Sequence, residues 1–374
     1  MVLQSDSSNL AMLVDSSGKI AKIGTIDELS YLAAMDGCAC QLSVDGGVLL
    51  PGFVDAHTHP VFAGDRVHEF SMKLAGATYM EIQKAGGGIL YTVEKCRETS
   101  EDQLLSSFES VAMEMIQCGT TTIEAKSGYG LDTETELKLL RIIDMGAQFL
   151  PLEISGTFLG AHAIPQGSTE QEQAEKIINE MIPLIEKEKS DFHLESIENI
   201  DVFCEKGVFE VESSRKILEA GKKIGLKANF HAEELKQLGS AEMGANLKAR
   251  AMSHLEAISS NGIDAMAESG TVAILLPTTA LTLRLRHPPA RDMISKGVIV
   301  ALGSDFNPNA YCLSMPIVMY LACTQMRLSM AEALVASTIN AAYSINRGKT
   351  HGALSCGRFA DIVVLGRHFI SFLS

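Results

Sequence analysis

The feature that most constrains the fold is an alternation of eight short apolar or β-branched runs with segments of helical composition. The helix-like segments are rich in Ala, Leu, Lys and Glu, as at 101–117, 133–149, 168–187 and 211–224. Strands that alternate with helices form right-handed β-α-β units and a parallel sheet. The eight runs are 47–59, 119–128, 152–162, 199–205, 226–234, 249–256, 271–277 and 298–305.

Eight such units predict a closed (β/α)₈ barrel. The runs extend over 259 residues, close to the roughly 250 residues typical of that fold. A doubly wound open sheet is the alternative. Such a sheet usually carries a glycine-rich phosphate-binding turn after its first strand, and "GFVDAHTHP" at 52–60 is not one. We therefore expect an α/β protein whose barrel covers residues 47–342, with a helical region near 315–342 capping it.

The segments outside the barrel pattern predict a second, smaller β layer. "NLAMLVDSSGKIAKIG" (9–24) places two apolar runs around a turn signal, and "GALSCGRFADIVVLG" (352–366) places a strand after a turn. We expect residues 1–46 and 343–374 to form a small β-sandwich domain beside the barrel.

Composition excludes several classes of protein. The formal net charge is −15, with 6% aromatic residues and no Trp, which disfavours binding to phosphate backbones and stacking on bases. No apolar run approaches the roughly 20 residues that span a bilayer. The start "MVLQSDSSNL" does not resemble a secretory signal, and none of the eight Cys forms a CxxC pair. We expect a cytoplasmic protein with reduced thiols that binds neither nucleic acid nor membranes.

Polar residues gather where the predicted strands end. In a βα barrel the carboxyl ends of the strands carry the catalytic groups. Five of the ten His residues fall at this rim, together with two carboxylates. The rim residues are His57, His59, His162, His231, Glu234, His254 and Asp305.

A metal site is the first function that these residues predict. His57 and His59 are two residues apart, so both side chains project from one face of the first strand. His231 and Asp305 come from strands elsewhere in the barrel and complete the set. Three imidazoles and one carboxylate suit Zn²⁺ or Fe²⁺ better than Mg²⁺ or Ca²⁺. An HxH pair alone is often only a surface pair or a hydrogen-bonded pair, and the other rim residues favour a metal here.

Glu234 and His254 are candidates for acid–base chemistry. Glu234 follows His231 by three residues, so it can lie beside a metal-activated water and shuttle its proton. The alternative is a carboxylate that stabilises a helix N-terminus. His254 can hydrogen-bond the attacking water or a developing oxyanion. Its alternative is a hydrogen-bonded His at a strand end.

Three further residues complete the candidates. Arg66 lies seven residues beyond His59, where it would clamp a substrate carboxylate unless it faces solvent. Tyr129, in "KSGYG", could donate a hydrogen bond into the same cavity or merely pack its loop. Cys204 lacks an evident base, so we interpret it as a buried thiol and not as a nucleophile.

The motifs also carry a family resemblance. "PGFVDAHTHP", "NFHAEE", "SHLE" and "ALGSDFNP" resemble the amidohydrolase superfamily of metal-dependent barrel hydrolases. Longer stretches resemble the branch that hydrolyses the ring amide of 4-imidazolone-5-propanoate in histidine degradation, and its animal members more than its bacterial ones. The resemblance covers residues 10–365, in "HPVFAGDRVHEFSMKLAGATYMEIQKAGGGI", "KSGYGLDTETELK", "GAHAIP", "NIDVFCEKGVF" and "LPTTALTLRL".

The resemblance implies a role for each residue. A single metal, Zn or Fe, would sit on His57, His59, His231 and Asp305. Arg66 would hold the propionate carboxylate of the substrate. Glu234, His254 and Asp305 would act in proton transfer and orientation. The imidazolone pocket would be lined by Tyr79, Tyr129, His162, Glu234 and Asn307.

The resemblance also bears on metal count and assembly. Many members bridge two metals with a carboxylated Lys at the end of strand four. Here that strand ends "DVFCE", and Lys126 at the end of strand two is a poor substitute, so a mononuclear site is expected. Members are often dimers, which makes a homodimer possible. They also build a fuller β-sandwich, so we expect both termini of this chain to be short.

Two other functions remain open from the sequence. A nucleobase or aminohydrolase-type deaminase has the same pattern of metal ligands, but a neutral base needs no carboxylate clamp such as Arg66. A barrel that has lost its chemistry, or a catalytically impaired short isoform, is the other alternative.

Overall fold

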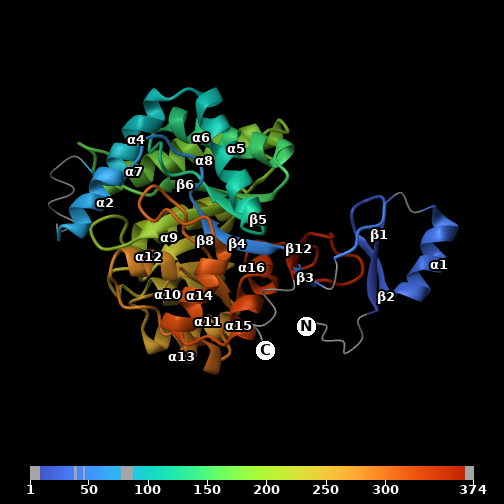
Figure 1. Ribbon diagram of the computed structural model, residues 1–374. Helices are drawn as coiled ribbons and strands as arrows, with labels where there is room; N and C mark the ends of the chain where they lie inside the picture. The colour runs from blue at the N-terminus through green and yellow to red at the C-terminus, as the bar shows by residue number, and fades with distance from the viewer. Residues whose placement is uncertain (1–8, 38–39, 45–46, 77–86, 367–374) are drawn as a thin grey trace.

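An eight-stranded parallel sheet forms the centre of the computed structural model, which describes residues 9–37, 40–44, 47–76 and 87–366 (Figure 1). The strands follow one another in chain order around the sheet, and each pairs in parallel with the next. All eight predicted runs are confirmed as strands. They are β4 (Phe53–Thr58), β5 (Thr120–Lys126), β6 (Glu153–Ala161), β7 (Ile197–Cys204), β8 (Lys227–Ala232), β9 (Ala251–His254), β10 (Val272–Leu275) and β11 (Val300–Leu302).

The sheet closes on itself at the carboxyl ends of its first and last strands. The backbone N–H of His59 donates to the carbonyl of Phe306 over 2.8 Å, and that of Asp305 donates to the carbonyl of His57 over 2.9 Å. These bonds bring three predicted metal ligands, His57, His59 and Asp305, to one end of the sheet through the backbone alone, and they complete the predicted (β/α)₈ barrel.

Helices surround the barrel, and their first turns are fixed by polar caps. Ser100, Asp132 and Ser259 each accept a hydrogen bond from the backbone two or three residues into the following helix. The helices are α2 (Val67–Leu74), α4 (Ile89–Glu98), α5 (Glu101–Gln117), α6 (Thr133–Phe149), α7 (Glu170–Lys176), α8 (Ile182–Ser190), α9 (Val211–Lys223), α10 (Ser240–Asn246), α11 (Ser260–Ser269), α12 (Pro277–Thr282) and α13 (Ala290–Ser295). A π-helical turn, Ile177–Met181, joins α7 to α8.

The core lies between these helices and the strands. On α5, Leu104, Phe108, Val111 and Met115 recur every three or four residues and are buried, so one face of the helix packs inward. The region expected to cap the barrel forms α14 (Met315–Met326), α15 (Met330–Ala336) and α16 (Ile339–Ser344). Of these, α16 packs against β4 and β11. None of the described helices is long and apolar enough to cross a membrane.

The first apolar run differs from the prediction, because it forms two strands. β3 (Val48–Pro51) pairs antiparallel with β12 (Ile362–Leu365), outside the barrel, and only β4 enters it. The chain changes sheets at Gly52, where a Cβ atom would collide with the side chain of Thr121. The absence of a side chain at this bend is what lets one continuous run serve two sheets.

The N-terminal segment contains the predicted hairpin and a helix that was not predicted. β1 (Leu10–Val14) pairs with β2 (Ile20–Thr25), and α1 (Ile26–Asp36) follows directly. Thr25 caps the start of α1 and Gly37 ends it in a left-handed conformation. A bridge from Lys19 to Phe359 ties the hairpin to the C-terminal segment, and the unit stands beside the barrel (Figure 1). The two terminal segments thus form small two-stranded sheets.

Candidate metal centre and active site

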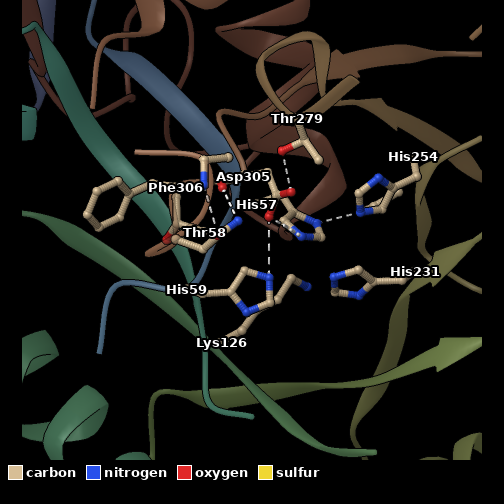
Figure 2. A network of polar contacts seen from close by, with 12 residues as sticks. His57, Thr58, His59, Lys126, His231, His254, Thr279, Asp305 and Phe306 are labelled. Carbon is tan, nitrogen blue, oxygen red and sulfur yellow. Dashed lines mark hydrogen bonds and ion pairs between the residues drawn. The ribbon is translucent and has the colours of Figure 1, made fainter. Parts of the chain in front are cut away.

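Four of the rim imidazoles and one carboxylate meet at the carboxyl end of the barrel, and all are buried (Figure 2). The potential ligand atoms of His57, His59 and His231 lie within 4.8 Å of one another, as do those of His57, His254 and Asp305. His57 belongs to both groups. The structure therefore brings the four predicted ligands together and adds His254 at their edge.

Two of the strand-borne imidazoles, those of His57 and His231, are each held through one ring nitrogen. His57 Nδ1 lies 2.8 Å from Ser253 Oγ, and His231 Nδ1 lies 3.0 Å from Asp201 Oδ1. These contacts leave both Nε2 atoms available. His57 Nε2 is buried without a hydrogen-bond partner among the described residues. A buried nitrogen lone pair without a donor is what a divalent cation satisfies, so the residues fit a metal.

The carboxylate of Asp305 is aimed at the imidazoles by its other oxygen. Thr279 Oγ1 donates to Asp305 Oδ2 over 2.6 Å, and Oδ1 lies 3.4 Å from Nε2 of both His57 and His59. Burial opposes the charge, but the two imidazoles outweigh it and hold the Asp305 pKa well below its ordinary value. Asp305 has a φ of 50°, a conformation that side chains rarely adopt and that tends to occur at functional sites.

His254 lies between two carboxylates at the edge of the cluster. Its Nε2 is 3.6 Å from Glu234 Oε2, and its Nδ1 is 3.7 Å from Glu256 Oε2. Burial raises the pKa of Glu234 to about 7. Burial opposes the charge of His254, but the two carboxylates outweigh it and raise its pKa to about 10. Glu234 can therefore exchange a proton near neutral pH while His254 stays a donor.

Tyr129 and His162 form one wall beside the cluster. The His162 ring stacks on that of His59 with centroids 5.0 Å apart, and the Tyr129 ring is 5.2 Å from His162. Glu136 holds the loop that carries Tyr129, because its carboxylate accepts the backbone N–H groups of Gly128, Gly130 and Leu131. Burial holds the His162 pKa well below its ordinary value, so this wall is neutral.

Arg66 forms a forked ion pair with Glu69, which the sequence did not single out. Arg66 Nε and Nη2 donate to the two Glu69 oxygens over 2.7 and 2.6 Å. Lys73 Nζ lies 3.0 Å from the same carboxylate, and the backbone N–H of Gly88 also donates to it. Burial opposes the charge of Glu69, but Arg66 outweighs it and lowers the Glu69 pKa to about 2. The predicted clamp is thus a fixed, buried guanidinium.

The other predicted residues take different places. Asn307 donates to the carbonyl of Asp305 and accepts from the backbone of Asn309 and Ala310, so its side chain shapes the loop after β11. Tyr79 lies outside the described residues. Cys204 is buried, as predicted, and burial raises the pKa of its thiol to about 11.

The residues that sequence reasoning missed are those that hold the ligands and the other site residues in place. They are Asp201, Ser253, Thr279, Glu256 and Glu69. One signal was available for Asp201, which is a charged residue between apolar neighbours on a predicted strand. Such residues are seldom buried without a partner.

Comparison with known proteins agrees with this geometry. A family model described as "Amidohydrolase family" matches residues 48–371. The chain belongs to the amidohydrolase family.

Named relatives of this amidohydrolase narrow the assignment. A "Probable imidazolonepropionase" of Nematostella vectensis is 55% identical over 356 residues, covering 95% of this chain and 83% of that protein. One of Homo sapiens is 52% identical over 357 residues, with the same shares of the two chains. The amidohydrolase described here is therefore a member of the imidazolonepropionase branch.

Solved structures support the fold of this amidohydrolase. A guanine deaminase from C. acetobutylicum superposes with a TM-score of 0.69 at 17% identity, covering 94% of this chain and 84% of that one. An adenosine deaminase from Xanthomonas campestris with bound zinc gives 0.69 at 15% identity, covering 97% and 81%. At such identities the likeness concerns the barrel architecture alone.

Proposed function

We propose that this protein hydrolyses the ring amide C–N bond of 4-imidazolone-5-propanoate to N-formimino-L-glutamate, a step of histidine degradation. The observation that carries the proposal is a buried imidazole–carboxylate cluster with a proton-exchanging Glu234, in a chain 55% identical to a probable imidazolonepropionase. A fixed Arg66 accompanies it, and its charge acts on Tyr129 at the wall of the cluster. The cluster suits hydrolysis, and the arginine suits a substrate that carries a carboxylate.

One divalent metal, Zn or Fe, would be held by His57, His59, His231 and Asp305. When bound, such a metal lowers the pKa of a water molecule toward about 7 and polarises a carbonyl oxygen. The protein orients three of these ligands, because Ser253, Asp201 and Thr279 engage the other ring nitrogen of His57, that of His231 and the other oxygen of Asp305. Burial of the cluster excludes bulk water and strengthens each electrostatic contact.

Glu234 and His254 would divide the proton chemistry between them. Glu234 accepts the proton of the attacking water and then delivers it to the leaving ring nitrogen, which opens the ring. His254, kept protonated by Glu234 and Glu256, donates a hydrogen bond to the oxyanion that develops on the ring carbonyl. The separation of 3.6 Å between Glu234 Oε2 and His254 Nε2 lets both groups serve one reacting carbon.

Arg66 would bind the propionate carboxylate. Its fork to Glu69 uses Nε and Nη2, so the substrate meets the side of the guanidinium that carries Nη1. An arginine held in this way loses little conformational entropy when it binds a second carboxylate. This requirement for an anionic substrate separates the proposed reaction from deamination of a neutral base.

The test is a paired assay on purified protein. We expect the ultraviolet absorbance of 4-imidazolone-5-propanoate to fall with time, no ammonia to be released, and a metal chelator to abolish the reaction. One ammonia per turnover would instead identify a deaminase. A folded protein that contains no metal and leaves the absorbance unchanged would identify a barrel without chemistry.

A further inference from the structure

A buried group of three charged side chains lies directly behind one of the proposed metal ligands. Lys126 Nζ, at the end of β5, is 2.7 Å from Glu124 Oε1 and 2.7 Å from Asp201 Oδ2. The side chains of all three are 0% exposed. Buried charges cost several kcal/mol each unless they are paired and hydrogen-bonded. The proposed reaction gives these residues no role.

The group reaches the metal centre through Asp201. Asp201 Oδ1 accepts the backbone N–H of His231 and lies 3.0 Å from its Nδ1, while Oδ2 lies 2.9 Å from the same ring nitrogen and 2.7 Å from Lys126 Nζ. The backbone N–H on one oxygen and Lys126 on the other thus hold the carboxylate of Asp201 in one orientation, with both oxygens against the ring nitrogen. Figure 2 shows Lys126 in the same cluster as His59 and His231.

We propose that Asp201 is a positioning residue for His231, and that Lys126 fixes the orientation of Asp201, so that this pair sets the affinity for the metal. The inference rests on the proposed function, because it assumes that His231 is a ligand. A carboxylate that accepts a hydrogen bond from Nδ1–H keeps the proton on that nitrogen and leaves the lone pair of a neutral imidazole on Nε2, where a metal binds.

Glu124 completes the arrangement by balancing the lysine. Its Oε1 also accepts hydrogen bonds from Thr157 Oγ1 and from Asn229 Nδ2. Lys126 thereby lies between two carboxylates, with donors directed at Glu124 on one side and at Asp201 on the other. The Lys126 donor that faces Asp201 can be satisfied only by an oxygen acceptor. The test makes use of this property.

Because of this property, the substitution Asp201→Asn should weaken metal binding. Lys126 requires an oxygen, so the asparagine carbonyl faces the lysine and its NH₂ group replaces Oδ1, against the backbone N–H of His231. That N–H then meets a donor in place of an acceptor, and His231 Nδ1 shares its one remaining oxygen with the lysine, so the imidazole is held less firmly with Nε2 free for a metal. We expect zinc affinity, measured by competition with a chromogenic chelator, to fall by about 10- to 100-fold. The visible spectrum of the Co²⁺-substituted protein should change as well.

A second variant tests the role of the lysine. In Lys126→Met/Asp201→Asn nothing constrains the asparagine, so its carbonyl can turn to His231 and affinity should recover at least several-fold relative to Asp201→Asn. This variant removes one charge of each sign from the buried group and so keeps the comparison possible if the single variant fails to fold. If Asp201→Asn fails to fold, the zinc affinity of the double variant should lie within about 10-fold of that of the parent.

The matched control is Asp144→Asn. Asp144 is a buried aspartate on α6 that accepts two hydrogen bonds from Ser196, away from the metal centre. It should bind zinc like the parent. Equal zinc affinity of folded Asp201→Asn and an active parent would overturn the role of Asp201. A double variant that binds no better than folded Asp201→Asn would overturn the role of Lys126. A parent that binds no zinc would instead overturn the proposed function.

Discussion

The floor of the site, by which we mean the imidazoles on the barrel strands, is built differently from its rim, by which we mean here the loop residues Arg66 and Asn307. On the floor, His57 and His231 lie on strands, and the partner that orients each one lies on another strand of the barrel: Ser253 on β9 for His57 and Asp201 on β7 for His231. At the rim, Arg66 and Asn307 stand in loops and are held by residues three positions away or fewer. The floor is therefore fixed by the register of the barrel and the rim by local pairs. Substitutions should accordingly abolish chemistry on the floor and weaken substrate binding at the rim.

The largest effect is expected beside the floor, for Glu234→Ala. The variant loses the group that carries the proton but none of the proposed ligands, so kcat should fall by about 10²–10⁴-fold. Metal content, measured by elemental analysis, should stay that of the parent. Glu212→Ala, an exposed glutamate on α9, is the control and should retain full activity. Normal turnover by Glu234→Ala would show that another group moves the proton.

A smaller effect is expected at the rim, for Arg66→Ala. A hydrogen bond to a charged group contributes about 1.5–3 kcal/mol, so KM should rise by roughly 10- to 100-fold while kcat changes little. Arg66→Lys keeps the charge but loses the forked ion pair with Glu69, so its KM should lie between those of the parent and Arg66→Ala. Steady-state kinetics on the parent and both variants decide the matter. An unchanged KM in Arg66→Ala would show that Arg66 does not bind the substrate carboxylate.

The smallest effect is expected for Glu69→Gln, which leaves Arg66 in place without its anionic partner. We expect KM to rise only several-fold. Because the Glu69 pKa falls from 4.5 to about 2 on folding, its stabilisation is complete above pH 4.5 and is lost as the pH drops toward 2. Thermal melts should therefore show parent and variant converging between pH 5 and pH 3. A gap that stayed constant over that range would contradict the ion pair.

Much of the floor could be predicted from the sequence, because its signals are local. Apolar runs mark the strands, and a polar residue at the end of a run marks the floor of the site, as with His231 and Asp305. The partners of these residues could not be predicted in the same way. Asp201 and His231 are 30 residues apart, and their contact depends on the register of β7 against β8.

The other misses have comparable physical causes. The switch between β3 and β4 depends on Thr121 packing against Gly52, which no run of hydrophobicity reveals. By contrast, α1 carried readable signals at both ends, Thr25 with Glu28 and then Gly37. Glu69 was not predicted because the sequence does not indicate which carboxylate forms an ion pair with an arginine in a loop.

The most direct test of the metal centre is reconstitution of metal-free protein. Zn²⁺ or Fe²⁺ would be added stepwise while ring opening is followed by ultraviolet absorbance. We expect activity to rise linearly and to reach its plateau at one metal per chain, and His57→Ala to show no such rise. Full activity in the metal-free protein, or a plateau at two metals per chain, would contradict a single metal held by His57, His59, His231 and Asp305.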